Sequence, residues 1–495
     1  MRFCFAVSLG TSFLLLLWAQ VGAQSQLNGV VELAHFYDLH DIHEGPETWD
    51  HCDWEAVEHR FRASVDTEED QVMVEDLMNL PGALRALCCI NGPRERECWG
   101  ANGDSDDTRR DLIEPHSSYS RCCFARLASA LRAPPAWIQA EVDLQQRQLR
   151  AAGWKPRSLE KGQLEALAER VASMPSFRPG EGLRLCRFRI KGGNISSCDV
   201  HQTQTGHDDA VLEALKLLAE LAPLPDVDFF VSTTDVEHEA WEVPIFAKSR
   251  PADVGSVLLI PHEFLLTLWN LKLAVKVRSA SHTFPWSAKA DRIFWRGGAT
   301  SQWICSSPDG RNCTPTEFPM NLDNFAATPR GRIVLLSSMA SQDVDARFTR
   351  VHDGDLHDFA VRRGLLDPDA GHGLQGGTAS YEDFYRFRYH WNDEHSDAVY
   401  WRMRGNSLQF LTVGSYAHWL LPHGATLKPF EHFIPVGHDQ NDLLDRIRWA
   451  RDNDAIAQAI AEAGSKATEE LLDPQAGPLA YLYALLVMYS EIQAF

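Results

Sequence analysis

The sequence predicts an α/β protein with parallel sheets and more than one domain. Between residues 182 and 472, short apolar segments alternate with amphipathic helical segments, which is the order that builds βαβ units. A chain of 495 residues is also too long for one ordinary core. The composition, 44% hydrophobic and 23% charged, is typical of a globular protein, and a formal net charge of −21 argues against nucleic acid as a partner.

Residues 1–23 predict a secretory signal peptide that is cleaved near Ala23. Arg2 precedes an apolar core around residues 13–21, and small residues follow that core. An uncleaved signal-anchor is the alternative, because the uncharged run up to Glu32 offers the ~20 residues that a membrane span needs. Both interpretations place the rest of the chain in the lumen of the secretory pathway, and only the second attaches it to a membrane.

The cysteines predict disulfides, since an oxidising lumen favours them and ten remain beside Cys4. Plausible local pairs are Cys186 with Cys198 and Cys305 with Cys313. Residues 24–140 are acidic and rich in turn residues, which predicts a small disulfide-stapled accessory module. Its cysteines are Cys52, Cys88, Cys89, Cys98, Cys122 and Cys123. Two glycosylation sequons, at Asn194 and Asn312, agree with a lumenal location.

The elements that follow are predicted from periodicity and turn residues. The first group comprises a helix near 158–172 with Ser158 as its N-cap candidate, a hairpin over 182–198 turning at Gly-Gly-Asn, a helix over 208–222, and strands over 227–235, 254–264 and 292–298. The second group comprises a segment at 331–340 that suits a strand or a helix, a helix and then a strand around Gly414, a helical region over 441–472, and a buried helix over 479–489.

Charged residues follow two of these strands, where open α/β sheets bind their ligands. Asp235 closes one strand. In "FWRGGATS", Arg296 leads into Gly297 and Gly298, with Thr300 beyond them. The fork of an arginine suits phosphate, and glycines let backbone N–H groups approach it. The ordinary alternatives are a capping aspartate and a solvated arginine.

Two acidic segments suggest metal ligands but fit structural roles better. Asp226 and Asp228 form a D-V-D that precedes its apolar run, whereas a metal-binding pair would follow one, so we expect a turn and the start of a strand. His352, Asp353 and His357 lie in a polar segment without a fixed metal-binding spacing. No metal site is predicted.

Three segments together resemble the family of Rumi-like protein O-glucosyltransferases and fungal capsule-associated xylosyltransferases. These are "PWSAKADRIFWRGGATS", "PRGRIVLLSS" with "DVDARFT", and "LKPFEHFIPV" with the helix "AQAIAEAGS". The resemblance covers roughly residues 182–470. It implies a GT-B fold, with two Rossmann-like halves facing a cleft: an acceptor half over 150–285 and a nucleotide-sugar half over 286–472, with a helix over 473–495 packing back.

The resemblance further implies transfer of glucose or xylose from a UDP-sugar to a hydroxyl of a protein or glycan acceptor, with inversion and without a metal or cofactor. Asp235 would be the catalytic base, and Pro261 and Phe264 would line the acceptor side. The residues implied to bind the UDP-sugar are Arg296, Gly297, Thr300, Arg332, Asp397 and Arg404, with Arg330 completing an R-x-R pattern.

This sequence departs from the family pattern at two places. Ser232 and Thr234 stand where relatives carry Asn and Arg before the catalytic Asp. The segment from Arg404 to Gly414 is two residues too long for the usual donor loop, in which a helix N-terminus near 404–407 is expected. Two alternatives therefore stay open: a lumenal sugar-binding protein that has lost the chemistry, and a metal-dependent GT-A transferase that uses Asp226 and Asp228.

Overall fold

The structure is a computed structural model that describes residues 124–173, 185–197, 207–232 and 241–267 and most of 270–495. Shorter gaps in the last range include 306–312, 316–319, 368–378 and 394–397. Backbone contacts divide the chain into residues 1–128 and 129–495, and nearly all described residues belong to the second unit. The signal segment, the six-cysteine cluster, Asp235, Asp397, Cys198 and Asn312 all lie outside the described residues. Across the described ranges, no helix is long and apolar enough to span a membrane.

The first sheet is mixed and has the strand order β2-β1-β3-β4-β6. Its strands are β1 (Leu185–Lys191), β2 (Asn194–Ser196), β3 (Val227–Ser232), β4 (Ile245–Ala247) and β6 (Val257–Leu259). The predicted hairpin is confirmed: β1 and β2 pair antiparallel around Gly192 and Gly193, whose φ angles of 55° and 81° suit glycine. β3, β4 and β6 are parallel, so their carboxyl ends share one edge.

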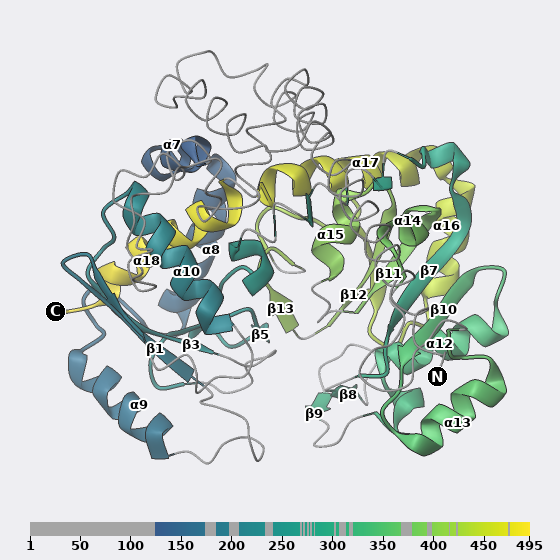
Figure 1. Ribbon diagram of the computed structural model, residues 1–495, viewed down its shortest axis with the longest axis horizontal. Helices are drawn as coiled ribbons and strands as arrows, with labels where there is room; N and C mark the ends of the chain where they lie inside the picture. The colour runs from purple at the N-terminus through teal and green to yellow at the C-terminus, as the bar shows by residue number, and fades with distance from the viewer. Residues whose placement is uncertain are drawn as a thin grey trace, which may run out of the picture. The chain divides into compact units, whose positions relative to one another are not determined.

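Helices cover this sheet (Figure 1). They are α8 (Ala136–Ala151), α10 (His207–Leu221) and α18 (Gly477–Ile492). α9 (Lys161–Ser173) lies beside β1, where Glu165 pairs with Arg187 at 2.9 Å, and the short α7 spans Ala125–Arg132. The helix expected near 158 begins at Lys161 instead, so Ser158 as its N-cap was wrong. The Ser158 hydroxyl is engaged by the preceding turn, where it donates to the Lys155 carbonyl at 2.7 Å.

The last helix of the chain, α18, is tied to the first sheet. Its Tyr481 hydroxyl donates to the Leu259 carbonyl at 3.0 Å, and its Tyr489 hydroxyl donates to the Pro244 carbonyl at 2.7 Å. Beyond the helix, Gln493 accepts from the Asp228 backbone N–H at 3.1 Å. The buried helix predicted over 479–489 is thereby confirmed, and its tyrosines have partners for their hydroxyls as buried tyrosines require.

The second sheet is wholly parallel, with the order β10-β7-β11-β12-β14. Its strands are β7 (Ala290–Gly298), β10 (Val344–Arg350), β11 (Phe387–Asn392), β12 (Leu408–Val413) and β14 (Ile434–Gly437). Numbered by their order in the chain, they run 2-1-3-4-5, which is a doubly wound arrangement of the Rossmann-like class. The α/β class with parallel sheets is therefore confirmed.

Helices connect and flank this sheet (Figure 1). They are α12 (Pro329–Met339), α13 (Gly354–Arg363), α14 (Tyr381–Tyr385), α15 (Ala398–Arg404), α16 (Leu443–Asp452) and α17 (Asp454–Leu471). The segment at 331–340, which suited either type of element, is helical. The helical region at 441–472 is confirmed as two helices that meet at Asn453.

The segment after Arg404 corrects two expectations. Residues 408–413 form strand β12 rather than a helix, and Arg404 ends α15, so residues 404–407 lie at a helix C-terminus rather than at an N-terminus. β12 is buried along nearly its whole length, so it reads as a continuous apolar run that periodicity cannot assign. The turn between α15 and β12 packs directly on the Tyr385 ring, and only glycine fits at position 405, because a Cβ there would lie 1.7 Å from that ring.

Short elements complete the description. β5 (Ser249–Pro251) pairs antiparallel with β13 (Tyr416–His418), which joins the segment after β12 to the loop before β6. β8 (Trp303–Cys305) pairs antiparallel with β9 (Cys313–Pro315). The single-turn 3₁₀ helices span Glu263–Leu266, Trp286–Ala288 and Phe325–Ala327.

Candidate functional site

The carboxyl edge of the second sheet brings polar residues of distant segments together. All five strands are parallel, so the residues that follow them meet at one edge. In the order 2-1-3-4-5 the connections leave in opposite directions from β7 and β11, and ligands of doubly wound folds bind at such a switch point. The residues that follow these two strands are Thr300 and Asp393.

Arg330 bridges this switch point. Its Nε donates to the Asp393 carboxylate at 2.7 Å, and one terminal nitrogen donates to the Thr300 hydroxyl and, at 3.4 Å, to the Gly298 carbonyl. The Arg330 side chain is 20% exposed and that of Asp393 is 9% exposed. The guanidinium is therefore fixed by its neighbours and still reaches solvent, as a group that binds an incoming anion must.

The first turn of α12 holds Arg330 at this edge and also contains Arg332. Thr328 caps the helix by accepting from the Gly331 N–H at 3.1 Å, and Pro329 occupies the first turn. The packing there is close, because a Cβ on Gly331 would lie 1.7 Å from the Phe325 carbonyl oxygen. A capped N-terminus beside arginines presents backbone dipoles and positive charge to an anion.

Two more guanidinium groups belong to elements at this edge. One terminal nitrogen of Arg332 is buried and has no hydrogen-bond partner among the described residues, while its Nε donates to the Ala326 carbonyl at 3.4 Å. The Arg350 guanidinium at the end of β10 lies 3.9 Å from where a Cβ on Gly298 would sit. The edge is thus cationic around a backbone that lacks side chains, and a phosphate oxygen can approach it. We call Gly298, Thr300, Arg330, Arg350 and Asp393 the switch-point cluster, and the contact of Arg332 with a diphosphate stays a prediction.

Arg296 lies two residues before the end of β7 and faces carboxylates. It forms ion pairs with Asp345 at 2.9 Å and with Asp367, and its guanidinium carbon lies 4.3 Å from the centre of the Phe294 ring. Its side chain is 9% exposed. Gly297 packs against Trp295, because a Cβ there would lie 2.4 Å from the indole. The contact of Arg296 and Gly297 with a diphosphate stays a prediction.

Arg404, at the end of α15, is fully enclosed by protein. It donates to the Asn270 side chain at 3.3 Å and to the Leu472 carbonyl, and burial lowers its pKa to about 10. The guanidinium is therefore charged at neutral pH and serves contacts between segments. Asp397, its expected partner on the donor loop, lies outside the described residues.

The carboxyl edge of the first sheet carries a charged cluster that sequence reasoning missed. Lys248 follows β4, and its ammonium lies 3.3 Å from His262 Nε2 and 3.8 Å from the Glu263 carboxylate. His262 Nδ1 lies 2.9 Å from Glu263, and the Phe264 ring centre is 4.8 Å from the imidazole centre. Pro261 begins this segment after β6. The useful sequence signal was position, since Lys248 directly follows β4 and the segment from Pro261 to Phe264 begins two residues after β6.

Asp226 and Asp228 have structural partners. Asp226 accepts from the Gly192 N–H in the hairpin turn at 2.7 Å, and Asp228 receives two hydrogen bonds from Arg187, at 2.8 and 2.7 Å. The expected roles in a turn and a strand are confirmed. Asp353 caps α13 by accepting from the Leu356 N–H at 2.8 Å. Among the residues that the structure describes, no group of three or more His, Cys, Asp or Glu side chains is placed to hold a metal ion.

Three of the predicted modification sites lie wholly or partly on described backbone: the Cys186 and Cys305–Cys313 disulfides and the sequon at Asn194. Cys186 in β1 is disulfide-bonded, and its predicted partner Cys198 falls outside the described residues. The β8–β9 ladder places Cys305 directly opposite Cys313. Opposed residues of antiparallel strands lie about 4.5–5.5 Å apart at Cα, within the range that a disulfide spans. Asn194 is exposed at the start of β2.

Comparisons with known sequences agree with the predicted resemblance. Residues 323–495 match the sequence model of glycosyl transferase family 90. Protein O-glucosyltransferase 2 of Danio rerio is 24% identical over 333 residues, which are 64% of this chain and 57% of the relative. Protein O-glucosyltransferase 3 of Homo sapiens is 31% identical over 297 residues, 57% of this chain and 50% of that protein. O-glucosyltransferase rumi of Drosophila pseudoobscura pseudoobscura is 24% identical over 270 residues, 50% of this chain and 56% of that protein.

The chain therefore spans little more than half the length of these relatives. The matched family region contains Arg330, Arg332, Arg350 and Asp393, whereas Thr300 precedes it. The resemblance to the Rumi-like O-glucosyltransferases, predicted from the sequence, is confirmed.

Proposed function

We propose that this Rumi-like protein is an inverting glycosyltransferase that moves glucose or xylose from a UDP-sugar to a hydroxyl group of a protein or glycan. The observation that carries the proposal is the bridge from Thr300 through Arg330 to Asp393 at the switch point of the second sheet. A diphosphate needs several cationic or N–H donors that converge on a small volume. The switch-point cluster supplies the cationic donors, and the N-terminus of α12 adds its dipole, although its Gly331 and Arg332 N–H groups are already bound by Thr328.

The two sheets correspond in this proposal to the two halves of a GT-B transferase. The first sheet would serve the acceptor, with Pro261 and Phe264 on its carboxyl edge, and the second sheet would hold the nucleotide sugar. Arg296, Gly297, Asp397 and Arg404 are further donor-side candidates from the family resemblance. We place Arg330 before Arg296, because Arg296 is already neutralised by two carboxylates.

Asp235 is the proposed base. The acceptor oxygen attacks C1 of the sugar from the face opposite UDP, its proton passes to the Asp235 carboxylate, and the bond between C1 and the diphosphate oxygen breaks. UDP leaves with the electron pair of that bond, and the arginines of the switch-point cluster stabilise the charge that develops. The protein supplies both the base and the cations in this scheme, so we propose that it needs neither a metal nor a cofactor.

The proposed compartment is the lumen of the secretory pathway, in the endoplasmic reticulum or the Golgi. The N-terminal sequence, the disulfide-bonded Cys186 and the exposed sequon at Asn194 support this location. The proposed partners are a UDP-sugar and a protein or glycan acceptor. A membrane would be a partner only if the N-terminal segment remained as an anchor.

One observation favours a second candidate, a sugar-binding protein that has lost transfer activity. Arg404, expected on the donor loop, is bound by Asn270 and Leu472. UDP binding without turnover of any UDP-sugar would support that candidate. A GT-A transferase is disfavoured by the bonds of Asp226 and Asp228, and loss of activity in EDTA would restore it.

The decisive experiment is calorimetric titration of UDP into the purified lumenal chain. We expect Arg330→Met to weaken UDP binding by about 10–100-fold, the usual contribution of hydrogen bonds to a charged group. Arg362→Met on the exposed surface of α13 is the matched control and should bind like the unmodified protein. A panel of UDP-sugars, with release of UDP as the readout, then identifies the donor. Unchanged UDP affinity in Arg330→Met, or no UDP binding to the unmodified chain, would contradict the proposal.

A further inference from the structure

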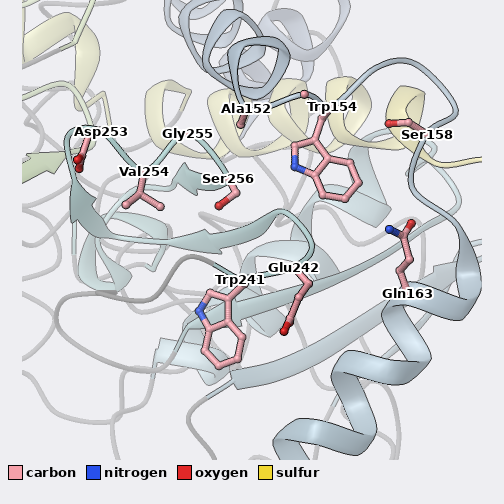
Figure 2. Close-up of a pocket in the computed structure, with 11 residues that line it drawn as sticks. Ala152, Trp154, Ser158, Gln163, Trp241, Glu242, Asp253, Val254, Gly255 and Ser256 are labelled. Atoms are coloured by element: carbon pink, nitrogen blue, oxygen red, sulfur yellow. The ribbon is translucent and has the colours of Figure 1, made fainter.

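An open pocket lies at the amino edge of the first sheet (Figure 2). Trp241 and Glu242 precede β4, and Ser256 directly precedes β6, while Trp154 and Gln163 come from α9 and the connection before it. Because β4 and β6 are parallel, their other ends carry Lys248 and the segment from Pro261 to Phe264. The pocket is therefore at the opposite edge from the predicted acceptor side. Its volume of about 600 Å³ is within the range of small-molecule sites.

We propose that this pocket binds a neutral sugar residue, as a carbohydrate subsite separate from the transfer centre. The proposal does not rest on the transfer reaction. The lining residues combine indole rings, two carboxylates, an amide and hydroxyls, and none of them is basic. Aromatic faces bind the C–H faces of sugars, while carboxylate and amide groups hydrogen-bond their hydroxyls. Without a cation, the same lining disfavours phosphate and hence the nucleotide part of a UDP-sugar.

Trp154 is placed by the end of α8. The backbone N–H of Trp154 donates to the Leu149 carbonyl at 3.0 Å, and the backbone N–H of Gly153 donates to the Arg150 carbonyl at 3.0 Å. This is the pattern of a Schellman motif. Gly153 adopts a φ of 96°, which suits glycine. The indole is partly exposed, and Figure 2 shows it hanging from this connection with Gln163 to one side. It is the aromatic platform of the site.

The opposite wall is held by ion pairing and stacking. Trp241 is only 4% exposed, and the Arg170 guanidinium lies 5.1 Å from the centre of its ring. Arg170 also forms an ion pair with Glu242. Trp241 is therefore a fixed part of this wall, too buried to stack on a ligand. The ion pair with Arg170 orients the Glu242 carboxylate and partly neutralises its charge. This arrangement suits a polyol better than a cationic ligand.

The third wall, the loop before β6, is fixed against α8. A Cβ on Gly255 would lie 2.8 Å from the Gln148 carbonyl oxygen, so the loop and the helix are in close contact. The Leu259 N–H donates to the Gln145 side chain at 3.2 Å, and Arg250 donates to the Gln148 side chain at 2.6 Å. A pocket whose walls are joined in this way is preformed, and little ordering is needed when a ligand binds.

Gln163 and Asp253 offer the polar contacts. The Gln163 side-chain oxygen accepts from the Glu160 N–H at 2.8 Å, while its NH₂ group is bound by no other described residue and is exposed. The Asp253 carboxylate is exposed at the pocket rim. Figure 2 shows Gln163 on the same side of the pocket as Trp154 and Asp253 at the far end, so the Gln163 amide is the group that can donate to a hydroxyl of a ring stacked on Trp154.

Saturation-transfer NMR with methyl glucoside and methyl xyloside tests the site, with saturating UDP present in a parallel sample. We expect saturation transfer from the unmodified chain to the C–H protons of the sugar, with the same intensity in the presence and absence of UDP. Trp154→Ala should weaken binding about tenfold, the scale of one lost aromatic contact, whereas Trp154→Phe should largely retain it. Phe495→Ala removes another exposed aromatic ring and should change nothing.

Three outcomes would overturn the proposal. These are no saturation transfer from the unmodified chain, undiminished saturation transfer from Trp154→Ala, or displacement of the sugar by UDP, which would locate the sugar in the donor site. Binding of a lysine peptide in place of the sugars would assign the pocket to a cationic segment instead. If Trp154→Ala lowers the melting temperature, Gln163→Ala at an exposed position provides the second test, with the same expected direction.

Discussion

Lys289 makes the stability of the second sheet dependent on pH. It immediately precedes β7 and is 4% exposed. Its ammonium donates to the Tyr385 carbonyl and to the Ser407 hydroxyl, both at 2.9 Å, and lies 5.4 Å from the Tyr385 ring centre. Both hydrogen-bond acceptors are neutral. Burial lowers the pKa of Lys289 to about 7, well below the value near 10.5 of a solvated lysine.

The sign of the effect follows from proton binding. Between about pH 7 and pH 10.5 the unfolded chain holds this proton and the folded chain does not, so the free energy of unfolding rises with pH. Integrating that difference from pH 7 to pH 9 gives a gain of about 2 kcal/mol from this one group. The gain is complete once the pH exceeds the pKa of the unfolded lysine.

Urea unfolding of Lys289→Met at pH 7 and pH 9 measures this contribution. Methionine retains much of the side-chain volume but cannot titrate, so the variant should lack the increment of about 2 kcal/mol that the unmodified chain gains. Lys155→Met, at an exposed position, controls for the loss of a charge and should retain the increment. The comparison uses the change with pH, because methionine also leaves the Tyr385 carbonyl and the Ser407 hydroxyl without their donor. Equal pH dependence in Lys289→Met and the unmodified chain would refute the reasoning.

Three further expectations concern the base, a disulfide and the N-terminus of α12. Asp235→Asn should retain UDP binding and lower transfer by ~10²–10⁴, and near-normal turnover would end the assignment. Non-reducing peptide mapping should recover Cys305 linked to Cys313, whereas free thiols at both positions would contradict the pairing. Gly331→Ala should destabilise the fold by about 1–3 kcal/mol in thermal unfolding, because its Cβ would lie 1.7 Å from a carbonyl oxygen; an unchanged melting temperature would show that the turn relaxes.

Local patterns predicted much of the fold. The hairpin at Gly192 and Gly193, the buried strand β3 and the helices over 441–472 each carry their signal within a few residues. β12 did not, because a strand buried along its length lacks the alternation that distinguishes it from a buried helix. The break before it depends on the contact of Gly405 with Tyr385, twenty residues earlier in the chain, which no local pattern contains.

The site shows the same division. The family resemblance grouped Thr300 with Arg330, and the structure places these two in contact, while their role in binding stays a prediction. Lys248 and Asp393 directly follow β4 and β11, two short strands that the sequence analysis did not predict. The partners of each charge could not be read in this way. Arg296 meets Asp345 and Asp367, and Arg330 meets Asp393, across separations that only the folded topology closes. A sequence therefore indicates which charges gather at an edge better than it indicates which of them remain for a ligand.

Arg296 and Arg330 can be told apart by ligand affinity. Arg296 is 9% exposed between two carboxylates, and Asp345 also pairs with Arg292 at 3.2 Å and with Arg347 at 3.9 Å. Arg296→Met therefore removes one of several cations and should cost about 1–3 kcal/mol of unfolding free energy. A diphosphate on Arg296 would also have to tolerate those two negative charges, which is unfavourable. Arg330 pairs with the Asp393 carboxylate and donates to neutral oxygens of Thr300 and Gly298, beside the N-terminus of a helix. We therefore expect Arg330→Met to lose UDP affinity and Arg296→Met to retain it. Arg330→Met also removes the cation that pairs with Asp393, whose side chain is 9% exposed, so both variants should lower the melting temperature and UDP affinity is the readout that separates them. If Arg296→Met weakened UDP binding and left the melting curve intact, Arg296 would be the diphosphate ligand and the priority of Arg330 over it would be wrong.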